Sequence, residues 1–196
     1  MLEILNWVAA ILILAASTGL ILSRDWRWSL AILAVQYLGV FWLVQAQWPT
    51  AMAAVKLVTG WMAAATLGIT LVSAAPRSGI ETAWPEGRLF RLFAAGLVIL
   101  TVFAFAPHVA DWLGGVSLAE VWGSLILIEM GLLHLGITSR PLRVTIALLT
   151  ILSGFEIIYA TVEGSILVTA LLAVINLGLA LAGSYTITIL PVEETQ

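Results

Sequence analysis

The chain has 196 residues, of which 62% are hydrophobic and 10% charged, and its mean hydropathy is +1.10. A water-soluble domain needs about a quarter of its residues charged, so this composition excludes one and makes the lipid bilayer the expected solvent. Because the chain has no cysteine, two histidines and a formal net charge of −3, we expect no disulfide, iron–sulfur cluster or other cofactor, and no nucleic-acid partner.

Seven apolar runs follow one another along the chain, each close to the roughly 20 residues that a helix needs to cross hydrocarbon. They are residues 4–23, 27–47, 50–74, 89–107, 117–138, 142–162 and 165–189. All six prolines lie between these runs or at their ends, as expected where no helical hydrogen bond has to be broken. The pattern predicts an all-α, polytopic transmembrane bundle of seven helices.

One longer polar connection, residues 76–88, divides the predicted bundle. Residues 1–75 form an N-terminal segment of three helices, and residues 89–196 form a C-terminal segment of four. Small residues recur at four-residue spacing within two of the predicted helices, which favours close helix packing. These residues are Gly60, Ala64 and Gly68 in the third helix, and Gly178 and Ala182 in the seventh.

Basic residues mark alternate connections and predict the orientation of the chain. Seven arginines share one side, whereas the N-terminus and the other connections contain no arginine or lysine. They are Arg24, Arg27, Arg77, Arg88, Arg91, Arg140 and Arg143. The positive-inside rule then places the N-terminus outside and the C-terminus inside. Five tryptophans at predicted interfaces suit a role as membrane anchors, namely Trp7, Trp26, Trp28, Trp48 and Trp112.

Lys56 is the only basic residue outside the arginine-bearing connections, and it lies about a turn and a half inside the predicted third helix. An ionised lysine deep in a helix costs at least ~2.5 kcal/mol on insertion scales, so it needs a carboxylate, water or a route to the surface. Glu156 in the sixth helix lies at a matching depth and is a geometrically allowed partner. Snorkelling of the lysine to the near surface is the alternative.

Further polar side chains lie within the predicted spans. Glu129, Gln36 and Asn176 are close to the middle of their helices, and His134 lies one to two turns further inward. These groups either relay protons or join helices by hydrogen bonds at ~0.6–2 kcal/mol per contact. For Gln36 and Asn176 we favour structural hydrogen bonding over a proton relay. We expect His134 to be an interior histidine whose hydrogen bonds are made within the protein. For Glu129 and Glu156 both interpretations stay open. Glu120, near the outer end of the fifth helix, is expected to be solvated.

The sequence argues against a retinal protein and shows no catalytic motif. A microbial retinal protein carries its Schiff-base lysine in the last helix, and the seventh predicted helix has none. The motifs Gly-x-Ser-x-Gly, His-Glu-x-x-His and the phosphate loop are also absent, so the chain has no catalytic site of its own that the sequence reveals.

The C-terminal helices carry GLLHLGITSRPLR at 131–143 and LLTILSG at 148–154. This stretch resembles the small K-type subunit of respiratory complex I, which has three helices and an arginine-bearing inner turn. The N-terminal helices, with DWRWSL at 25–30 and AVKLVTG at 54–60, resemble its J-type neighbour. Together the two halves are similar to component E of group-four membrane hydrogenases, a family of similar length with a comparable lysine where Lys56 stands.

The resemblance implies a non-redox subunit of a complex I-like or hydrogenase-type proton-translocating assembly in a bacterial or archaeal cytoplasmic membrane. Its implied partners are antiporter-like membrane subunits and lipids. The K-type glutamates would fall near Leu149 or Thr150 and near residues 174–176, where this chain has no acid. Lys56, Glu129 and Glu156 would then supply a rerouted path, or the chain would only connect and seal its partners. An independent small transporter or channel and a scaffold without an ion path remain as alternatives.

Overall fold

The computed structural model describes residues 2–73 and 87–189, and these residues form seven α-helices. The helices are α1 (Leu2–Leu22), α2 (Trp26–Gln45), α3 (Thr50–Ser73), α4 (Arg88–Leu113), α5 (Leu118–Gly136), α6 (Pro141–Val162) and α7 (Ile166–Ile189). Each is long and apolar enough to cross a membrane, so the chain is an integral, multi-pass helical protein, as predicted. Of the predicted connection 76–88, all but the last two residues lie outside the described residues.

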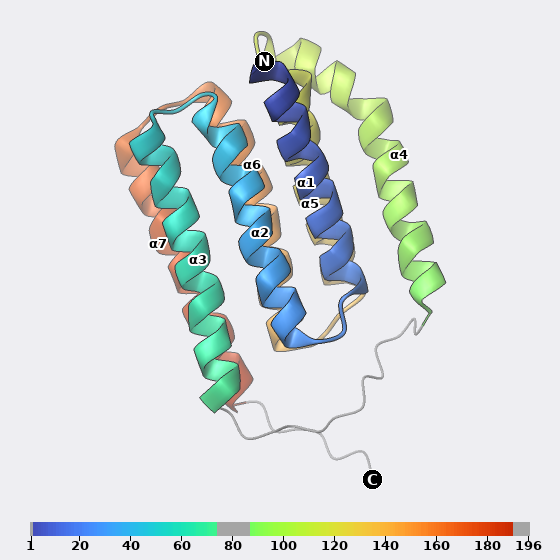
Figure 1. The fold of residues 1–196 in the computed structure, drawn as a ribbon, viewed down its shortest axis with the longest axis vertical. Helices are drawn as coiled ribbons and strands as arrows, with labels where there is room; N and C mark the ends of the chain where they lie inside the picture. Colours follow the sequence, from blue (N-terminus) through green and yellow to red (C-terminus); the bar gives the residue numbers. More distant parts are fainter. Residues whose placement is uncertain (1, 74–86, 190–196) are drawn as a thin grey trace.

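The helices form two layers with α4 at one side (Figure 1). Helices α1, α2 and α3 lie side by side in one layer, and α5, α6 and α7 lie behind them in the same order. Helix α1 therefore packs on α5, α2 on α6 and α3 on α7. Helix α4 packs mainly on α5 and leaves most of its surface exposed.

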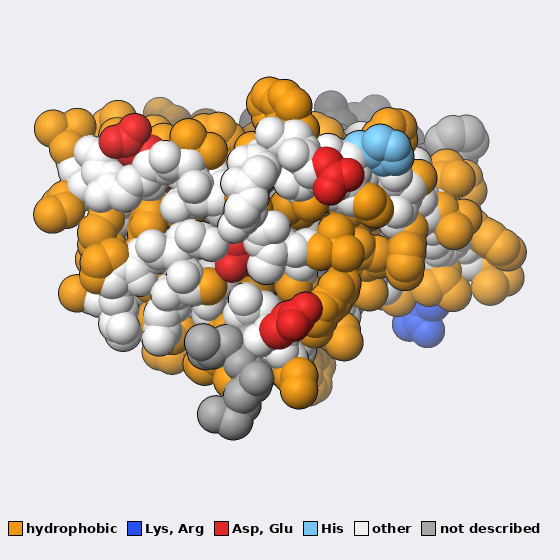
Figure 2. All heavy atoms as spheres, turned by 90° about the horizontal axis from the view of Figure 1, so that it is seen from above, with side chains coloured by type: hydrophobic (Ala, Val, Ile, Leu, Met, Phe, Trp, Pro, Cys, Tyr) orange, Lys and Arg blue, Asp and Glu red, His pale blue; other side chains and the backbone are white. Residues whose placement is uncertain are grey.

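The two ends of the bundle differ in charge. The end at which α1 finishes, here named the arginine end, carries Arg24, Arg27, Arg88, Arg91, Arg140 and Arg143. The end at which α1 begins, here named the acidic end, carries Glu3, Asp111, Glu120 and Glu163. Figure 2 looks onto the acidic end and shows carboxylate side chains across it, with a histidine beside one of them and a lysine or arginine side chain only at the rim.

Close helix packing depends on glycine at several positions, of which three are described here. A Cβ at Gly60 would overlap the Tyr37 ring, one at Gly183 would overlap Thr145, and one at Gly154 would lie 2.7 Å from the Ser124 carbonyl oxygen. The predicted role of Gly60 fits this geometry. The prediction was wrong for contacts of Gly178 and Ala182 within this chain, because both are exposed and a Cβ at Gly178 would meet nothing within 4 Å.

Helix α4 extends beyond its predicted end at residue 107. Pro107 lies inside the helix, which continues to Leu113. Proline removes only one helical hydrogen bond, and membrane helices tolerate this where neighbouring groups compensate. Figure 1 shows the acidic-end part of α4 leaning over the bundle.

Two arginines hold the end of α1. Arg91 of α4 donates from Nη1 to the Ile21 carbonyl oxygen at 3.2 Å, and Arg143 of α6 donates from Nη2 to the Ser23 carbonyl oxygen at 2.8 Å. Both arginines are buried. Since α1 has no basic residue in its last turn, they stabilise its otherwise unpaired carbonyl groups from outside the helix.

Buried polar contacts also join the connections at the acidic end. Glu120 accepts a hydrogen bond from Gln47 Nε2 at 2.9 Å and forms a capping box with Ser117 at the start of α5. It is 2% exposed, so the prediction of a solvated Glu120 was wrong. Trp48 is also buried and donates to the Glu163 carbonyl oxygen at 2.9 Å, which makes it a packed core residue rather than a surface anchor.

Candidate functional site

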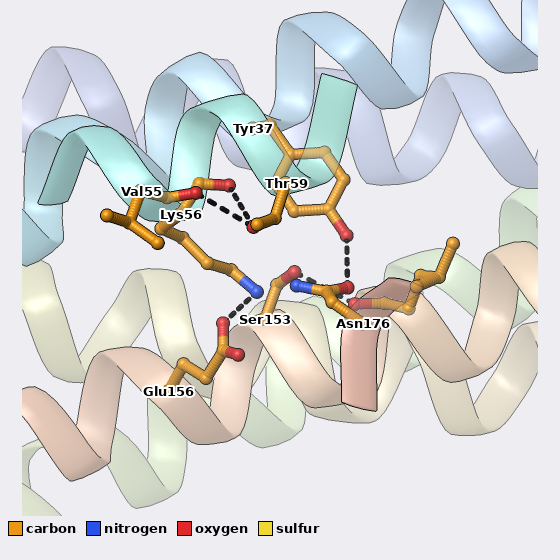
Figure 3. Close-up of polar contacts among 8 residues, drawn as sticks. Tyr37, Val55, Lys56, Thr59, Ser153, Glu156 and Asn176 are labelled. Atoms are coloured by element: carbon orange, nitrogen blue, oxygen red, sulfur yellow. Dashed lines mark hydrogen bonds and ion pairs between the residues drawn. The ribbon is translucent and has the colours of Figure 1, made fainter. Parts of the chain in front are cut away.

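An ion pair between Lys56 of α3 and Glu156 of α6 is buried between the two helical layers. Lys56 Nζ contacts Glu156 Oε2, and the residues are 5% and 2% exposed (Figure 3). Both lie about 9 Å, by helix rise, from the acidic ends of their helices. Lys56 therefore does not extend to the surface of the chain, as snorkelling would require.

Tyr37 of α2 lies next to the ion pair. Lys56 Nζ is 5.3 Å from the centre of the Tyr37 ring, a distance at which a cation is attracted to an aromatic face. The Tyr37 hydroxyl donates to Asn176 Oδ1 of α7 at 3.0 Å. Tyr37 thus connects the pair to the middle of α7, a role that was not predicted from the sequence, because a tyrosine in an apolar helix looks like ordinary core.

More polar side chains continue toward the middle of the bundle. Ser153 lies one turn from Glu156 on α6 and donates to the Leu149 carbonyl oxygen at 2.8 Å (Figure 3). Gln36 Nε2 of α2 donates to Thr150 Oγ1 of α6 at 3.3 Å. We name the whole set the polar band; it consists of Gln36, Tyr37, Lys56, Thr150, Ser153, Glu156 and Asn176.

The polar band has unused hydrogen-bonding capacity. Gln36 Oε1 and Asn176 Nδ2 are buried without a hydrogen-bond partner among the described residues. One of these atoms is a hydrogen-bond acceptor and the other is a donor. A small cavity lies beside the pair, with a volume of about 10 Å³. This volume is close to the smallest space that holds one water molecule.

The cavity and the packing around it make the two sides of the polar band unequal. The cavity wall includes Trp48 and Thr169, which lie between the ion pair and the acidic end. On the side of the polar band that faces the arginine end, α2, α3, α6 and α7 pack on one another through apolar side chains that are fully buried. These are Leu33, Leu67, Ile146 and Ala180. The polar band therefore approaches the acidic end and is separated from the arginine end by an apolar layer.

Glu129 and His134 lie apart from the polar band. Glu129 faces α4, where its carboxylate accepts a hydrogen bond from the Thr101 hydroxyl. His134 lies near the arginine end of α5, is 3% exposed, and its Nε2 has no hydrogen-bond partner among the described residues. Of the six predicted residues, the structure thus brings together Lys56, Glu156, Gln36 and Asn176.

The chemistry available in the polar band is proton exchange and hydrogen bonding. Its ionisable groups are one amine, one carboxylate and one phenol. Within residues 2–73 and 87–189, no three histidine, aspartate or glutamate side chains are grouped so that they could hold a metal ion.

Comparisons with protein-family models, curated proteins and solved structures found no match to this chain. Its function has to be inferred from its own residues.

Proposed function

We propose that the chain is a non-redox membrane subunit of a proton-translocating assembly of the complex I-like or membrane-hydrogenase type, and that the Lys56–Glu156 pair exchanges protons in it. The observation that carries the proposal is the burial of this pair between α3 and α6, inside the membrane-spanning part of the chain. Ionisable side chains within a membrane are expensive, and where they occur they mark ion or proton paths.

The pair supplies a simple proton chemistry. Transfer of one proton from the Lys56 ammonium to the Glu156 carboxylate converts two charges into two neutral groups without changing the net charge. A proton that enters from the adjacent cavity gives the pair a net positive charge, and its release restores the starting state. Tyr37, whose ring lies against the ammonium group, stabilises the charged form of the lysine.

The unequal packing on the two sides of the polar band supports a subunit of a larger assembly over an independent channel. A proton that reaches the pair from the acidic end meets the apolar layer of Leu33, Leu67 and Ile146 on the way to the arginine end. A continuous path then requires groups of a partner subunit or a second arrangement of this chain. The exposed apolar side chains of α4 offer a surface for such a partner; they include Phe93, Leu97, Leu100, Phe103 and Phe105.

A membrane scaffold without an ion path is the second candidate function. It is favoured by the hydrogen bonds Tyr37–Asn176 and Gln36–Thr150, which join helices in the way expected of structural contacts. The two candidates differ in what happens when both charges of the pair are removed together.

The test compares Lys56→Met, Glu156→Gln and the double variant in the native complex, with Glu163→Gln at the exposed acidic end as the control. Each single variant should reduce complex yield, since loss of one partner of a buried pair costs about 3–5 kcal/mol. The double variant should recover yield because no lone charge remains, but its proton translocation should stay at least about tenfold below wild type. Glu163→Gln should match the wild type in both measurements.

Recovery of both yield and translocation in the double variant would support the scaffold. The partners are tested separately, by mass spectrometry of chains that co-purify in mild detergent, where antiporter-like membrane subunits are expected. Proton movement by the purified chain alone in liposomes, at the rate of the complex, would instead identify an independent channel.

A further inference from the structure

A second and larger cavity opens at the arginine end, where α4 begins beside the α1–α2 connection. Its volume is about 650 Å³, within the range of small-ligand sites. Its wall combines two arginines, Arg24 and Arg88, with apolar side chains that include Leu22, Ile32 and Leu92. We name this cavity the arginine groove. It lies at the opposite end of the bundle from the cavity beside Lys56.

The polar part of the groove is suited to an anion. Arg24 and Arg88 are both exposed, and the structure gives neither a hydrogen bond nor an ion pair with the described residues. Asp25 is the one carboxylate in the wall, and its Oδ1 already accepts the Arg27 backbone N–H at 3.0 Å as the N-cap of α2. Among the described residues, the groove wall therefore carries a net positive charge.

The start of α4 adds a second attraction for an anion at the same place. Its N-cap residue, Gly87, has no side chain and so provides no side-chain cap for the N–H groups of the first turn. Free N–H groups and the helix dipole at such an end favour a phosphate group. Arg88 begins this same turn and contributes to the groove wall.

The apolar part of the groove distinguishes a lipid from a free phosphate ion. Leu22, Ile32 and Leu92 lie on the membrane-spanning side of the arginines, where an acyl chain would run. Trp28 also lines the groove and is 68% exposed, as suits an indole at the membrane–water interface. A phosphate ion would use only the polar wall, whereas a phospholipid uses both.

We propose that the arginine groove binds one anionic phospholipid. Its phosphate lies between Arg24 and Arg88 at the start of α4, and one acyl chain follows the apolar wall. A net positive groove selects an anionic headgroup over a zwitterionic one, as basic pockets between membrane helices do. The lipid then fills the gap between α4 and the α1–α2 pair at this end.

Native mass spectrometry of the purified full chain tests the proposal. The chain is titrated with phosphatidylglycerol and with phosphatidylcholine of the same acyl chains. We expect one phosphatidylglycerol to bind about tenfold more tightly than phosphatidylcholine, given two arginines near the headgroup. Arg24→Gln and Arg88→Gln should each reduce this preference severalfold. Arg27→Gln is the matched control, because it removes the same charge from a neighbouring residue outside the groove wall.

Asp25→Asn provides a test in the opposite direction. Asparagine caps a helix as well as aspartate does, so the fold is kept while the one negative charge of the groove is removed. The preference for phosphatidylglycerol should increase. Inorganic phosphate at millimolar concentration should not displace the lipid, since it lacks the acyl chain. Equal binding of the two lipids, an equal loss in Arg27→Gln, or displacement by phosphate would each overturn the proposal.

Discussion

Tyr37 contacts both the buried ion pair and α7, although the sequence did not single it out. Its ring lies against the Lys56 ammonium group and its hydroxyl donates to Asn176, so it links α2 to both α3 and α7 and forms part of the environment of the pair. The ring occupies this position because Gly60, on the facing side of α3, has no Cβ. A methyl group there would displace the ring.

Gly60→Ala should therefore destabilise the chain, by about 1–3 kcal/mol, as overpacking of a close helix contact does. Gly178→Ala is the control, because a Cβ at that position meets nothing within 4 Å. Alanine is the better helix former, so the control should be neutral or stabilising by up to about 1 kcal/mol. Unfolding of both variants in mixed detergent, followed by helical circular dichroism, measures the difference. An equal effect of the two substitutions would contradict the role given to Gly60.

Functional side chains were easier to predict from the sequence where a charge interrupts an apolar helix than where the side chain resembles the ordinary apolar core. Lys56 and Glu156 were found because a charge in a membrane helix is costly and helix rise gives its depth. Glu120 was misjudged although Ser117, three residues before it, gave the spacing of a capping box. Tyr37 gave no such signal, because its position depends on Gly60 in another helix and not on its own neighbours in sequence.

Among the seven helices, α4 is the one with the smallest buried share. Only one of its faces is buried, through Arg91, Ala95, Val102 and Ala106. Two side-chain hydrogen bonds fasten it to neighbouring helices: Arg91 reaches the end of α1, and Thr101 donates to Glu129 of α5. The second of these lies within the membrane-spanning part, where no water competes for the two groups.

Thr101→Val should weaken the attachment of α4, with a loss of about 0.6–2 kcal/mol in unfolding free energy, as measured for interhelical hydrogen bonds. Thr66→Val is the control, because the Thr66 hydroxyl is exposed and bonds only to the Met62 carbonyl of its own helix. Hydrogen exchange should increase in α4 more than in α6. Glu129→Gln should be nearly silent, since the amide oxygen still accepts from Thr101. A larger effect of Thr66→Val than of Thr101→Val would contradict this assignment.

The boundaries of the helices were predictable where a polar connection follows and less so where a proline stands alone. Six helices begin and end within about two residues of the predicted limits, because hydrophobic length and turn residues agree there. Helix α4 was predicted to end at Pro107, and it continues because the membrane favours an unbroken helix over an exposed backbone. Arg91 and Arg143 were read as connection charges, although they lie within helices and bind the end of α1.

The packing of the helices into two layers could not be predicted from the sequence. Apolar runs of similar length do not say which helices pack together, since lipid and protein interior are equally apolar. The separation of charge was readable, and in the structure the arginine end and the acidic end are opposite. This separation bears on the orientation of the chain in the membrane.

We predict that the arginine end faces the inside of the cell, since short arginine-bearing connections stay on the cytoplasmic side. Ser139→Cys reports on the arginine end and Gly164→Cys on the acidic end, and both residues are exposed. Because the chain has no cysteine of its own, each variant carries a single thiol. A membrane-impermeant reagent added to intact cells should label Gly164→Cys and should label Ser139→Cys only after lysis. The reverse pattern, or labelling of both in intact cells, would contradict the orientation.

The ion pair between the two layers also sets an order of events during synthesis. Lys56 and Glu156 are about 100 residues apart, so α4, α5 and most of α6 are made after α3 and before the glutamate. At usual translation rates the lysine waits roughly 5–20 s for its glutamate. During that interval its position near one end of α3 lets the amine reach the headgroup region, so the charge is tolerated without a partner. The ion pair itself can form only after α6 has been made, so the contact between these two helices is a late one in the synthesis of the chain.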